Sequence, residues 1–457
     1  MLLKKSTLKI HFIAIGGSIM HNLAICLRKM GHHVSGSDDE IFEPAISQLK
    51  KNNLLPEKLG WSADKITDNT DLVVLGMHAK KDNPELKKAI QLNIKIVSFP
   101  ELIADFSKNK KRIVIAGSHG KTTTTSILMH VFKENKINFD YLVGARIDGF
   151  ENMVKLTEES EYILIEGDEY LSSPLDNRPK FFHYKPQHTI ITGIAWDHIN
   201  VFPTEEIYLK TFKDYLETLT NATVVYFKKD ENIDKVISGS TNKLKFLPYS
   251  TPEYKILDDK STIKLDDEYV ELSLFGKHNF ENINAAYYLW KSLGFEGKKF
   301  REKISSFSGP ALRLENWYTD SNYIFIRDFA HAPSKVQASI NAVTEHYNHF
   351  TKIAVIELHT FSSLTESFLP HYKETTKGVD KVFIFFDEKA LELKGKQIPT
   401  EKTLKEAFNR KDLVIIKNKM TLKEEIIKNL IPKTIFLLMS SGKLDGFTKT
   451  ELKEVIK

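Results

Sequence analysis

The chain of 457 residues has a single cysteine, Cys26, and no apolar run as long as a membrane-spanning helix. One cysteine excludes an internal disulfide framework and is typical of a protein in a reducing compartment. The apolar runs all fall short of the roughly 18 residues that a membrane helix needs. The start, MLLKKSTLKIHFIAIGG, resembles a signal peptide, but its β-branched run leads into glycines and predicts a first strand. We therefore expect a cytoplasmic protein without membrane insertion.

The sequence also lacks a large excess of one charge, internal repeats and low-complexity tracts. It has 65 basic and 60 acidic residues, for a net charge of +5. This mild and dispersed excess does not favour nucleic acid as a partner, and it suits an enzyme with small anionic ligands. The length predicts several globular domains.

Strand-like and helix-like segments alternate through nearly the whole chain, which predicts an α/β fold with parallel sheets. The lysine-rich stretch at 107–112 is typical of a linker, and SGPALRLE at 308–315 marks a second junction. We predict three domains, 1–108, 109–309 and 310–457, each with a mainly parallel sheet. The expected strands are 9–15, 32–36, 71–76, 94–99, 113–116, 161–166, 188–192, 323–328, 352–357, 381–386, 412–416 and 434–439, and the expected helices include 19–30, 126–132, 281–293 and 297–306.

The stretch IVIAGSHGKTTTTSILMHVF, from Ile113 to Phe132, predicts a phosphate-binding loop. A short buried strand leads into a turn with Gly117 and Gly120, and a helix follows. A helix N-terminus after a glycine turn binds anions through free N–H groups and the helix dipole. Lys121 would then reach the terminal phosphates and Thr122 would bind Mg²⁺. The spacing is a shortened G-x-x-G-K-T, and the alternative is an ordinary strand–turn–helix with a solvated lysine.

Acidic residues follow the next strands. Glu166, Asp168 and Glu169 come directly after the strand at 161–166, and Asp197 and His198 come shortly after the strand at 188–192. Carboxylates at strand ends suit Mg²⁺, which prefers oxygen ligands. The Asp–His pair alone would more often be a surface pair, but it lies one strand along from the acids.

The first strand leads into a glycine turn with Gly16 and Gly17, and Asp38 follows the next strand. This pattern departs from the dinucleotide fingerprint, because Ala14 stands at its first glycine position and its third is not glycine either. An acid in the position of Asp38 meets a ribose hydroxyl in such folds. The alternative is a purely structural turn.

Further polar residues stand near predicted helix starts. Asn279 and Asn282 carry amides that suit a purine edge, although Asn279 could simply cap its helix. Asp328 ends a strand, and His331 lies in the turn before a helix that starts with proline. Arg313, just upstream, could approach a phosphoryl group when domains close.

Taken together, these blocks resemble the Mur ligase family, the ATP-dependent amide-forming enzymes of peptidoglycan assembly. The matching stretches are AIGGSIM, SGSD, AGSHGKTTTT, EGDEY, DH, GKHNFENINAA, RLE and DFAHAP, which span almost the whole chain. The resemblance implies a Rossmann-like first domain, a central ATPase domain with the phosphate loop, and a Rossmann-like third domain that closes on ATP. It also implies a monomer or weak homodimer.

The resemblance implies the following residue roles. The catalytic residues would be Lys121, His198, Arg313 and His331. The ATP site would comprise Gly117, Ser118, His119, Gly120, Lys121, Thr122, Thr123, Asn279, Asn282, Arg313 and Asp328. The UDP-sugar site would comprise Gly16, Gly17, Ser18 and Asp38. The Mg²⁺ ligands would be Thr122, Glu166 and His198.

Within the family, GGxxM and SGSD resemble the ligases that take UDP-N-acetylmuramate. EGDEY followed by DNRPKFFHYKP resembles the murein peptide ligase branch, which attaches L-alanyl-γ-D-glutamyl-meso-diaminopimelate in peptidoglycan recycling. The carboxylates of this tripeptide would be met by Arg178, Lys180 and His183. The alternative is a surface segment that packs its aromatic residues on the core while its charges stay solvated.

The sequence departs from the family pattern at several positions. Gly193 stands where asparagine is usual, Leu312 where arginine is usual, and Ala332 where a polar residue is usual; ELHTFSSL at 357–364 lacks the arginine usual there. Some relatives carry a carbamylated lysine on the metals, and Lys213 lies at a plausible distance past His198.

Other functions with related sequences stay open. The first is UDP-N-acetylmuramate–L-alanine ligation, which needs only a small acceptor pocket. The second is folylpolyglutamate synthesis, which the glycine turn of the first domain disfavours. The third is a nucleotide-binding regulator without ligation, which the set of Lys121, Thr122, Glu166 and His198 disfavours.

Overall fold

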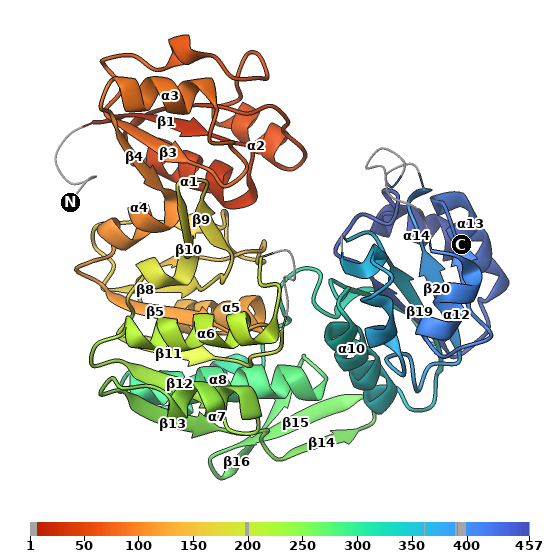
Figure 1. The fold of residues 1–457 in the computed structure, drawn as a ribbon. Helices are drawn as coiled ribbons and strands as arrows, with labels where there is room; N and C mark the ends of the chain where they lie inside the picture. The colour runs from red at the N-terminus through yellow and green to blue at the C-terminus, as the bar shows by residue number, and fades with distance from the viewer. Residues whose placement is uncertain (1–6, 197–200, 361, 389–390, 392–398, 457) are drawn as a thin grey trace. The chain divides into compact units, whose positions relative to one another are not determined.

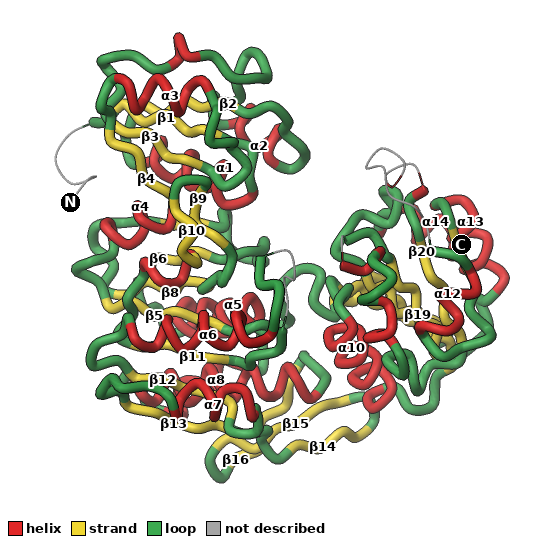
Figure 2. Tube along the Cα trace, viewed as in Figure 1, coloured by secondary structure: helices red, strands yellow, loops and turns green. Residues whose placement is uncertain are grey.

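The computed structural model describes residues 7–196, 201–360, 362–388, 391 and 399–456. They form two compact units, one of residues 1–250 and 282–304 and the other of residues 251–281 and 305–457. Figure 1 shows the elements, and Figure 2 shows helices flanking the strands of each parallel sheet. Among the helices that the structure describes, none is both long and apolar enough to cross a membrane.

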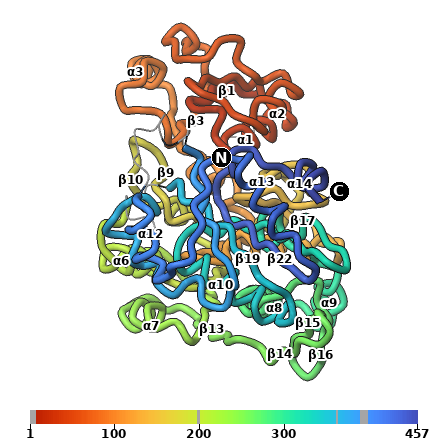
Figure 3. The backbone as a smooth tube through the Cα atoms, turned by 90° about the vertical axis from the view of Figure 1, so that its right-hand side faces the viewer, coloured from red at the N-terminus to blue at the C-terminus, as the bar shows by residue number. Residues whose placement is uncertain are grey.

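The first unit begins with a parallel four-stranded sheet in the order β2-β1-β3-β4. Its alternating side chains fill two separate cores, so helices α1 and α3 cover opposite faces (Figures 1 and 3). The elements are β1 (Lys9–Ile13), α1 (Ser18–Lys29), β2 (His33–Ser37), α2 (Ala45–Lys51), η1 (Ala63–Lys65), β3 (Leu72–Leu75), α3 (Pro84–Gln91), β4 (Lys95–Ser98) and α4 (Phe99–Phe106).

The same unit continues with a seven-stranded sheet in the order β13-β12-β11-β5-β8-β6-β7, parallel except for the β6–β7 pair. A two-stranded hairpin, β9–β10, lies outside it. The elements are β5 (Lys111–Ala116), α5 (Lys121–Glu134), β6 (Phe139–Leu142), β7 (Val154–Lys155), β8 (Tyr162–Glu166), β9 (Leu171–Ser173), β10 (Asp176–Pro179), η2 (Lys180–His183), β11 (His188–Ile191), α6 (Glu205–Glu217), β12 (Thr223–Phe227), α7 (Glu231–Ser238), β13 (Lys245–Tyr249), α8 (Lys277–Ser292), whose first turns belong to the second unit, and α9 (Gly297–Ile304).

The second unit contains an antiparallel meander, β14–β16, and a six-stranded sheet in the order β17-β18-β22-β19-β20-β21. Only the β17–β18 pair of the larger sheet is antiparallel. The elements are β14 (Tyr254–Leu257), β15 (Lys260–Leu265), β16 (Glu268–Leu272), β17 (Glu315–Thr319), β18 (Tyr323–Asp328), α10 (Pro333–His346), β19 (Thr351–Glu357), η3 (Ser362–Leu364), η4 (Leu369–Tyr372), β20 (Lys381–Phe385), α12 (Glu401–Ala407), β21 (Val414–Ile416), α13 (Lys419–Lys428), β22 (Thr434–Met439) and α14 (Lys449–Ile456).

The predicted α/β class with three mainly parallel sheets is confirmed, and the predicted strands match within a few residues. The helix expected from Ser126 was placed too late, because α5 begins at Lys121. Ile127, Leu128, Val131 and Phe132 of this helix are fully buried and form its inward face. The proposed domain boundaries stay a prediction.

The segment predicted as a linker, 107–112, is instead a tight turn with a buried lysine. Lys110 donates to the carbonyls of Thr157 and Ser160, both at 2.7 Å, and lies 3.0 Å from Asp140. The two charged side chains are 6% and 0% exposed. The next residue, Lys111, already belongs to β5 and pairs with Glu161 at the surface. The sequence pattern does not distinguish Lys110 from Lys111, although only Lys110 lies beside a buried carboxylate, that of Asp140.

Asp38 closes the glycine turn between β1 and α1. Its carboxylate accepts the N–H groups of Gly16, at 2.6 Å, and of Asp39. A side chain at Gly16 would come within 2.9 Å of the Asp38 carboxylate, which explains a glycine there. Ala14, at the fingerprint's first glycine position, has a φ of 68°. Burial raises the pKa of Asp38 to about 6, although the bond from Gly16 opposes this rise.

The buried pair predicts different effects for the two adjacent lysines. Lys110→Met leaves Asp140 charged and unpaired in the core, so we expect the free energy of unfolding to fall by about 3–5 kcal/mol. Lys111→Met, the matched control, removes only an exposed pair and should change it by less than about 1 kcal/mol. Urea denaturation of both variants measures the difference. Equal effects would contradict the assignment of Lys110 to the core.

The raised pKa of Asp38 predicts a pH-dependent difference between wild type and Asp38→Asn. The folded-state pKa of about 6 exceeds the ordinary value of an aspartate, 3.8, so the folded state binds this proton more tightly. The wild type therefore loses stability as the pH rises from about 4 to 6, and the variant does not. We expect the variant to gain about 2–3 kcal/mol relative to wild type between pH 4 and pH 7. Asp64→Asn, at an exposed position, is the control, and a pH-independent difference for Asp38→Asn would contradict the prediction.

Candidate nucleotide and peptide site

The predicted phosphate loop connects β5 to α5. Gly117 and Gly120 have φ values of 120° and 77°, and a side chain would clash with Thr192 at the first and with Asn282 at the second. Ser118 donates its N–H to the Gly193 carbonyl at 2.9 Å. The loop is therefore held from β11 on one side, and helix α5 begins directly after it, as anion binding requires.

Lys121 is folded onto this loop. Its ammonium donates to the Gly117 carbonyl at 2.6 Å and to Glu169 at 2.7 Å, and its side chain is 13% exposed. Burial would lower the pKa of Lys121, but Glu169 and Asp168 outweigh burial and raise it. The solvated lysine of the alternative interpretation is not observed, because a carboxylate 48 residues along the chain lies beside Lys121.

The predicted metal ligands Thr122 and Glu166 lie together. The Thr122 hydroxyl donates to Glu166 Oε1 at 2.8 Å, and the other carboxylate oxygen accepts the Gly144 N–H at 2.7 Å. A hydroxyl and a carboxylate at this separation form an oxygen donor set that fits Mg²⁺. Asp197 and His198 lie outside the described residues.

The other two acids after β8 are engaged by cations. Asp168 lies 2.5 Å from Lys180, and Glu169 pairs with Lys121. Burial acts to raise the pKa of Asp168, but the charges of Lys180 and Lys121 lower it overall. Of the three acids, only Glu166 is placed beside the Thr122 hydroxyl.

The predicted adenine residues differ in their surroundings. Asn282, 6% exposed, lies against Gly120 and accepts a bond from the Thr124 hydroxyl at 3.3 Å. Asn279 donates its amide to the Phe275 carbonyl at 2.9 Å, one turn earlier. Asn282 is thus placed beside the loop, whereas the side chain of Asn279 holds the start of its own helix. Contact of either with adenine stays a prediction.

In the second unit, Arg313, Asp328 and His331 gather around Phe329. The Arg313 guanidinium lies 4.5 Å from the Phe329 ring centre, and the His331 ring meets that ring edge-on. Asp328 accepts the N–H groups of Leu314, at 2.9 Å, and Ala330, at 2.7 Å. This carboxylate therefore ties together the loops that carry Arg313 and His331, and its predicted contact with ribose stays untested.

Three of the residues predicted to bind the UDP-sugar lie at the start of α1. Gly17 and Ser18 begin the helix, and His21 contacts the Gly17 carbonyl at 2.9 Å. The same helix start touches the central sheet region, because Asn22 accepts the Met153 N–H at 3.0 Å. The free N-terminus of α1 suits an anionic group such as a diphosphate.

The three residues predicted to read a peptide acceptor each meet a protein partner. Arg178 binds Asp176 through Nε, at 2.9 Å, and Nη2, at 2.6 Å. Lys180 pairs with Asp168, and His183 lies 3.2 Å from Asp176. The alternative was a surface segment that packs its aromatic residues on the core, and this packing is confirmed for Phe181 and Tyr184, which are buried. Arg178 is still 61% exposed, so its charge can reach a ligand.

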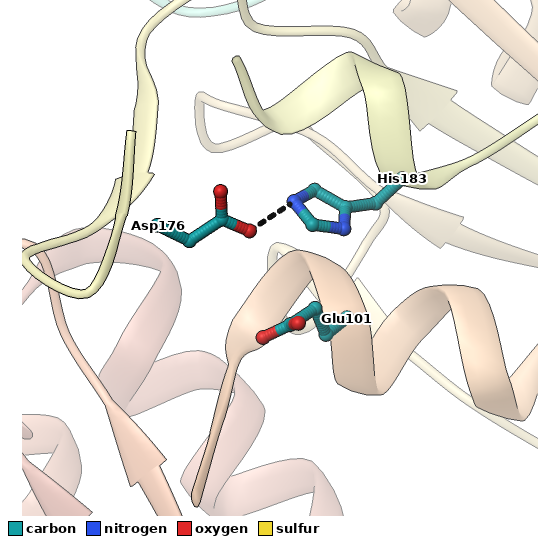
Figure 4. A group of neighbouring side chains, drawn as sticks. All are labelled: Glu101, Asp176 and His183. Carbon is teal, nitrogen blue, oxygen red and sulfur yellow. Dashed lines mark ion pairs between the residues drawn. The ribbon is translucent and has the colours of Figure 1, made fainter. Parts of the chain in front are cut away.

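Figure 4 shows that Asp176 and His183 face each other beside Glu101 of α4. Their nearest ligand atoms all lie within 4.8 Å of one another, a spacing that could hold a metal ion. However, Arg178 grips both oxygens of Asp176, and Glu101 accepts the N–H and hydroxyl of Ser98 in a capping box. A guanidinium beside the carboxylate disfavours a metal cation. We therefore assign this group to holding the β9–β10 hairpin on α4.

The interpretation of Lys213 as a carbamylated metal ligand stays a prediction, because the expected ligand His198 lies outside the described residues. Lys213 lies exposed on α6, and the end of its side chain lies close to Gly239, directly after α7. Glu217 on the same helix contributes charge nearby.

The sequence did not reveal the roles of Glu169 and Tyr208, which pack behind the loop. Sequence reasoning grouped Glu169 with possible metal ligands, whereas the structure places Glu169 against Lys121 and Tyr208. Tyr208 itself was not considered, because one tyrosine in an amphipathic helix carries no signal of its partners. His278, half-buried beside Asp328, was treated only as part of a motif; burial lowers its pKa and the nearby carboxylate opposes this.

Protein-family models cover more than half of the chain. Residues 9–111 match the model described as Mur ligase family, catalytic domain, and residues 115–290 match the Mur ligase middle domain. The UDP-N-acetylmuramate–L-alanine ligase of Caldanaerobacter subterraneus is 29% identical over 462 residues, with 95% of each chain covered.

Solved structures share the fold. The UDP-N-acetylmuramate–alanine ligase of Thermotoga maritima superimposes with a TM-score of 0.73 at 21% identity, covering 98% of this chain and all of that one. The murein peptide ligase of Psychrobacter arcticus gives a TM-score of 0.68 at 19% identity, with 98% of both chains covered. The chain therefore belongs to the Mur ligase family, whose members are ATP-dependent, ADP-forming amide ligases.

Proposed function

We propose that this Mur ligase joins UDP-N-acetylmuramate to the murein tripeptide L-alanyl-γ-D-glutamyl-meso-diaminopimelate, in peptidoglycan recycling. The observation that carries the proposal is the β9–β10 hairpin with η2, which adds Arg178, Lys180 and His183 directly after the acidic strand end. A tripeptide with several carboxylates needs cations in its pocket, whereas free alanine needs few.

The proposed chemistry follows from the residues around the loop. The lactoyl carboxylate of the muramate attacks the γ-phosphate of ATP and releases ADP, which leaves an acyl phosphate. Lys121 and the N–H groups of the loop offset the negative charge that develops on the phosphoryl oxygens. Mg²⁺, when held by Thr122, Glu166 and His198, supplies further positive charge there. The α-amine of the tripeptide then attacks the acyl carbon, and inorganic phosphate leaves as the amide forms.

The second unit supplies the remaining groups in this proposal. Arg313 and His331, both held around Phe329, would approach the phosphates when the units close on ligands, and Asp328 would meet the ribose. Closure would also exclude water, which otherwise hydrolyses an acyl phosphate. The amides of Asn279 and Asn282 would meet adenine.

A second candidate is UDP-N-acetylmuramate–L-alanine ligation. The observation that favours it is the similarity of this chain to relatives named as L-alanine ligases, among them the protein of C. subterraneus. It shares every step before the amine attacks, so only the acceptor distinguishes the two. A nucleotide-binding regulator without ligation is the third candidate, and it would release no phosphate with any acceptor.

A product analysis distinguishes these candidates. The protein is offered UDP-N-acetylmuramate, Mg²⁺ and ATP with either L-alanine, the tripeptide or a tripeptide with lysine in third place. We expect mass spectrometry to find the product of a tripeptide, with one phosphate released per amide. A product with L-alanine alone would establish the second candidate, and no product with any acceptor would establish the third.

Arg178 gives a prediction about the acceptor. Arg178→Ala should raise the KM for tripeptide by roughly tenfold, because a charged hydrogen-bond pair contributes about 1.5–3 kcal/mol. The KM for ATP should change less than about twofold, since Arg178 belongs to the β9–β10 hairpin and not to the loop between β5 and α5. Steady-state kinetics with each substrate varied in turn measures both.

The matched control is Arg146→Ala, which removes an arginine of another loop in the same unit. Equal changes in both KM values for Arg178→Ala, or no change in either, would mean that the peptide carboxylates are bound elsewhere. The stretch from His359 to Ser363 is then the next region to test.

A further inference from the structure

Glu169 is a fully buried carboxylate directly behind the phosphate loop. Its side chain is 0% exposed, and its Oε2 accepts a bond from Lys121 at 2.7 Å. Its other oxygen accepts the Tyr208 hydroxyl at 3.1 Å. A buried carboxylate is stable only when it is paired and hydrogen-bonded, and both oxygens of Glu169 meet that condition.

The hydrogen bonds of Glu169 lead to two residues of the loop, directly to Lys121 and through Tyr208 to Ser118. Because the Tyr208 proton goes to Glu169, the contact of 2.8 Å between Tyr208 and Ser118 makes the serine hydroxyl the donor. Ser118 in turn accepts the Ala195 N–H at 2.9 Å. One directed chain therefore joins Ala195, two residues before Asp197, to Ser118 and, through Glu169, to Lys121.

Lys121 needs such support because a lysine side chain is long and flexible. An ammonium has three protons, and within the described residues Gly117 and Glu169 take two of them. The third proton can then point at a ligand oxygen. If the Lys121 ammonium is already held in place before the reaction, no free energy is needed to order it during phosphoryl transfer. Preorganised groups lower an activation barrier in this way.

We propose that Glu169 is a positioning residue for the phosphoryl-transfer step: it fixes the Lys121 ammonium at the loop and, through Tyr208, ties Lys121 to Ser118. The assignment to metal binding does not account for its contacts, since the cation that it meets is a lysine. The inference rests on the proposed function only in that Lys121 contacts the phosphates of the nucleotide.

A double-mutant cycle tests this proposal, with Glu169→Gln, Lys121→Ala and the double variant. If Glu169 acts through Lys121, Glu169→Gln should lower kcat by at least roughly tenfold when Lys121 is present. Lys121→Ala should lower kcat by at least roughly 100-fold. Adding Glu169→Gln to Lys121→Ala should change kcat by less than about twofold, because the group that it positions is gone. Single-turnover phosphate release from labelled ATP measures all four proteins.

A merely structural role gives a different pattern. Glu169→Gln would then lower the amount of folded protein but leave kcat per nucleotide-binding site unchanged, or its effect would multiply with that of Lys121→Ala; either result overturns the proposal. Glu161→Gln, at an exposed carboxylate just before β8, is the matched control and should behave as wild type.

Two further measurements keep the test decisive. If Glu169→Gln is not recovered folded, Glu169→Asp keeps the charge but withdraws it by one methylene, and it should lower kcat several-fold; a wild-type kcat would overturn the proposal. If the wild type ligates no acceptor, the proposed function fails, and the same cycle is measured on ADP binding by calorimetry. Additive changes in ADP affinity would then overturn the positioning role, and non-additive changes would support it.

Discussion

The register of three parallel strands is the constraint on which the central site depends. Residue 116 of β5 pairs with Ile191 of β11, and Ile115 pairs with Glu166 of β8, so the three strands end at the same edge. Thr192 and Gly167 donate their N–H groups back to β5 at 3.0 and 2.8 Å. The phosphate loop, the acidic segment and the loop after β11 therefore leave the sheet side by side, as ligand sites in open parallel sheets do.

Charge pairing is the second theme of the first unit. Three of its lysines lie against carboxylates: Lys110 with Asp140, Lys121 with Glu169, and Lys180 with Asp168. In a low-dielectric interior, an unpaired charge would be strongly unfavourable, so each pair is retained until a ligand supplies another partner. If Lys121 and Lys180 bind phosphate or carboxylate as proposed, that binding is an exchange or sharing of partners. This differs from the simple picture of free lysines that wait for anions.

The similar proteins and the local chemistry of this chain favour different amine acceptors, L-alanine and a tripeptide respectively. The curated relatives carry the name of an alanine ligase, and solved structures of both ligase types share the fold. Identities near 20% to such structures establish the fold alone. The hairpin after β8 is a local feature with its own packing, since Phe181 stacks on Tyr215 with ring centres 4.3 Å apart. The exposed Arg178 of this hairpin can present charge to a ligand while the aromatic residues that follow it stay buried.

The sequence by itself determined the α/β class, the three parallel sheets and the order of their strands along the chain, because hydrophobic runs and glycine turns are local signals. It also located the glycine turn between β5 and α5 and brought Thr122 and Glu166 together, since the carboxyl ends of neighbouring parallel strands meet. It placed the start of α5 too late, because four threonines disfavour a helix locally and the loop geometry overrides that preference. Only the tertiary structure decided the partners of the charges. Lys110 and Lys111 are identical in sequence character, and Glu169 differs little from Glu166, but each meets groups far along the chain, and such long-range contacts leave no periodic trace in the sequence.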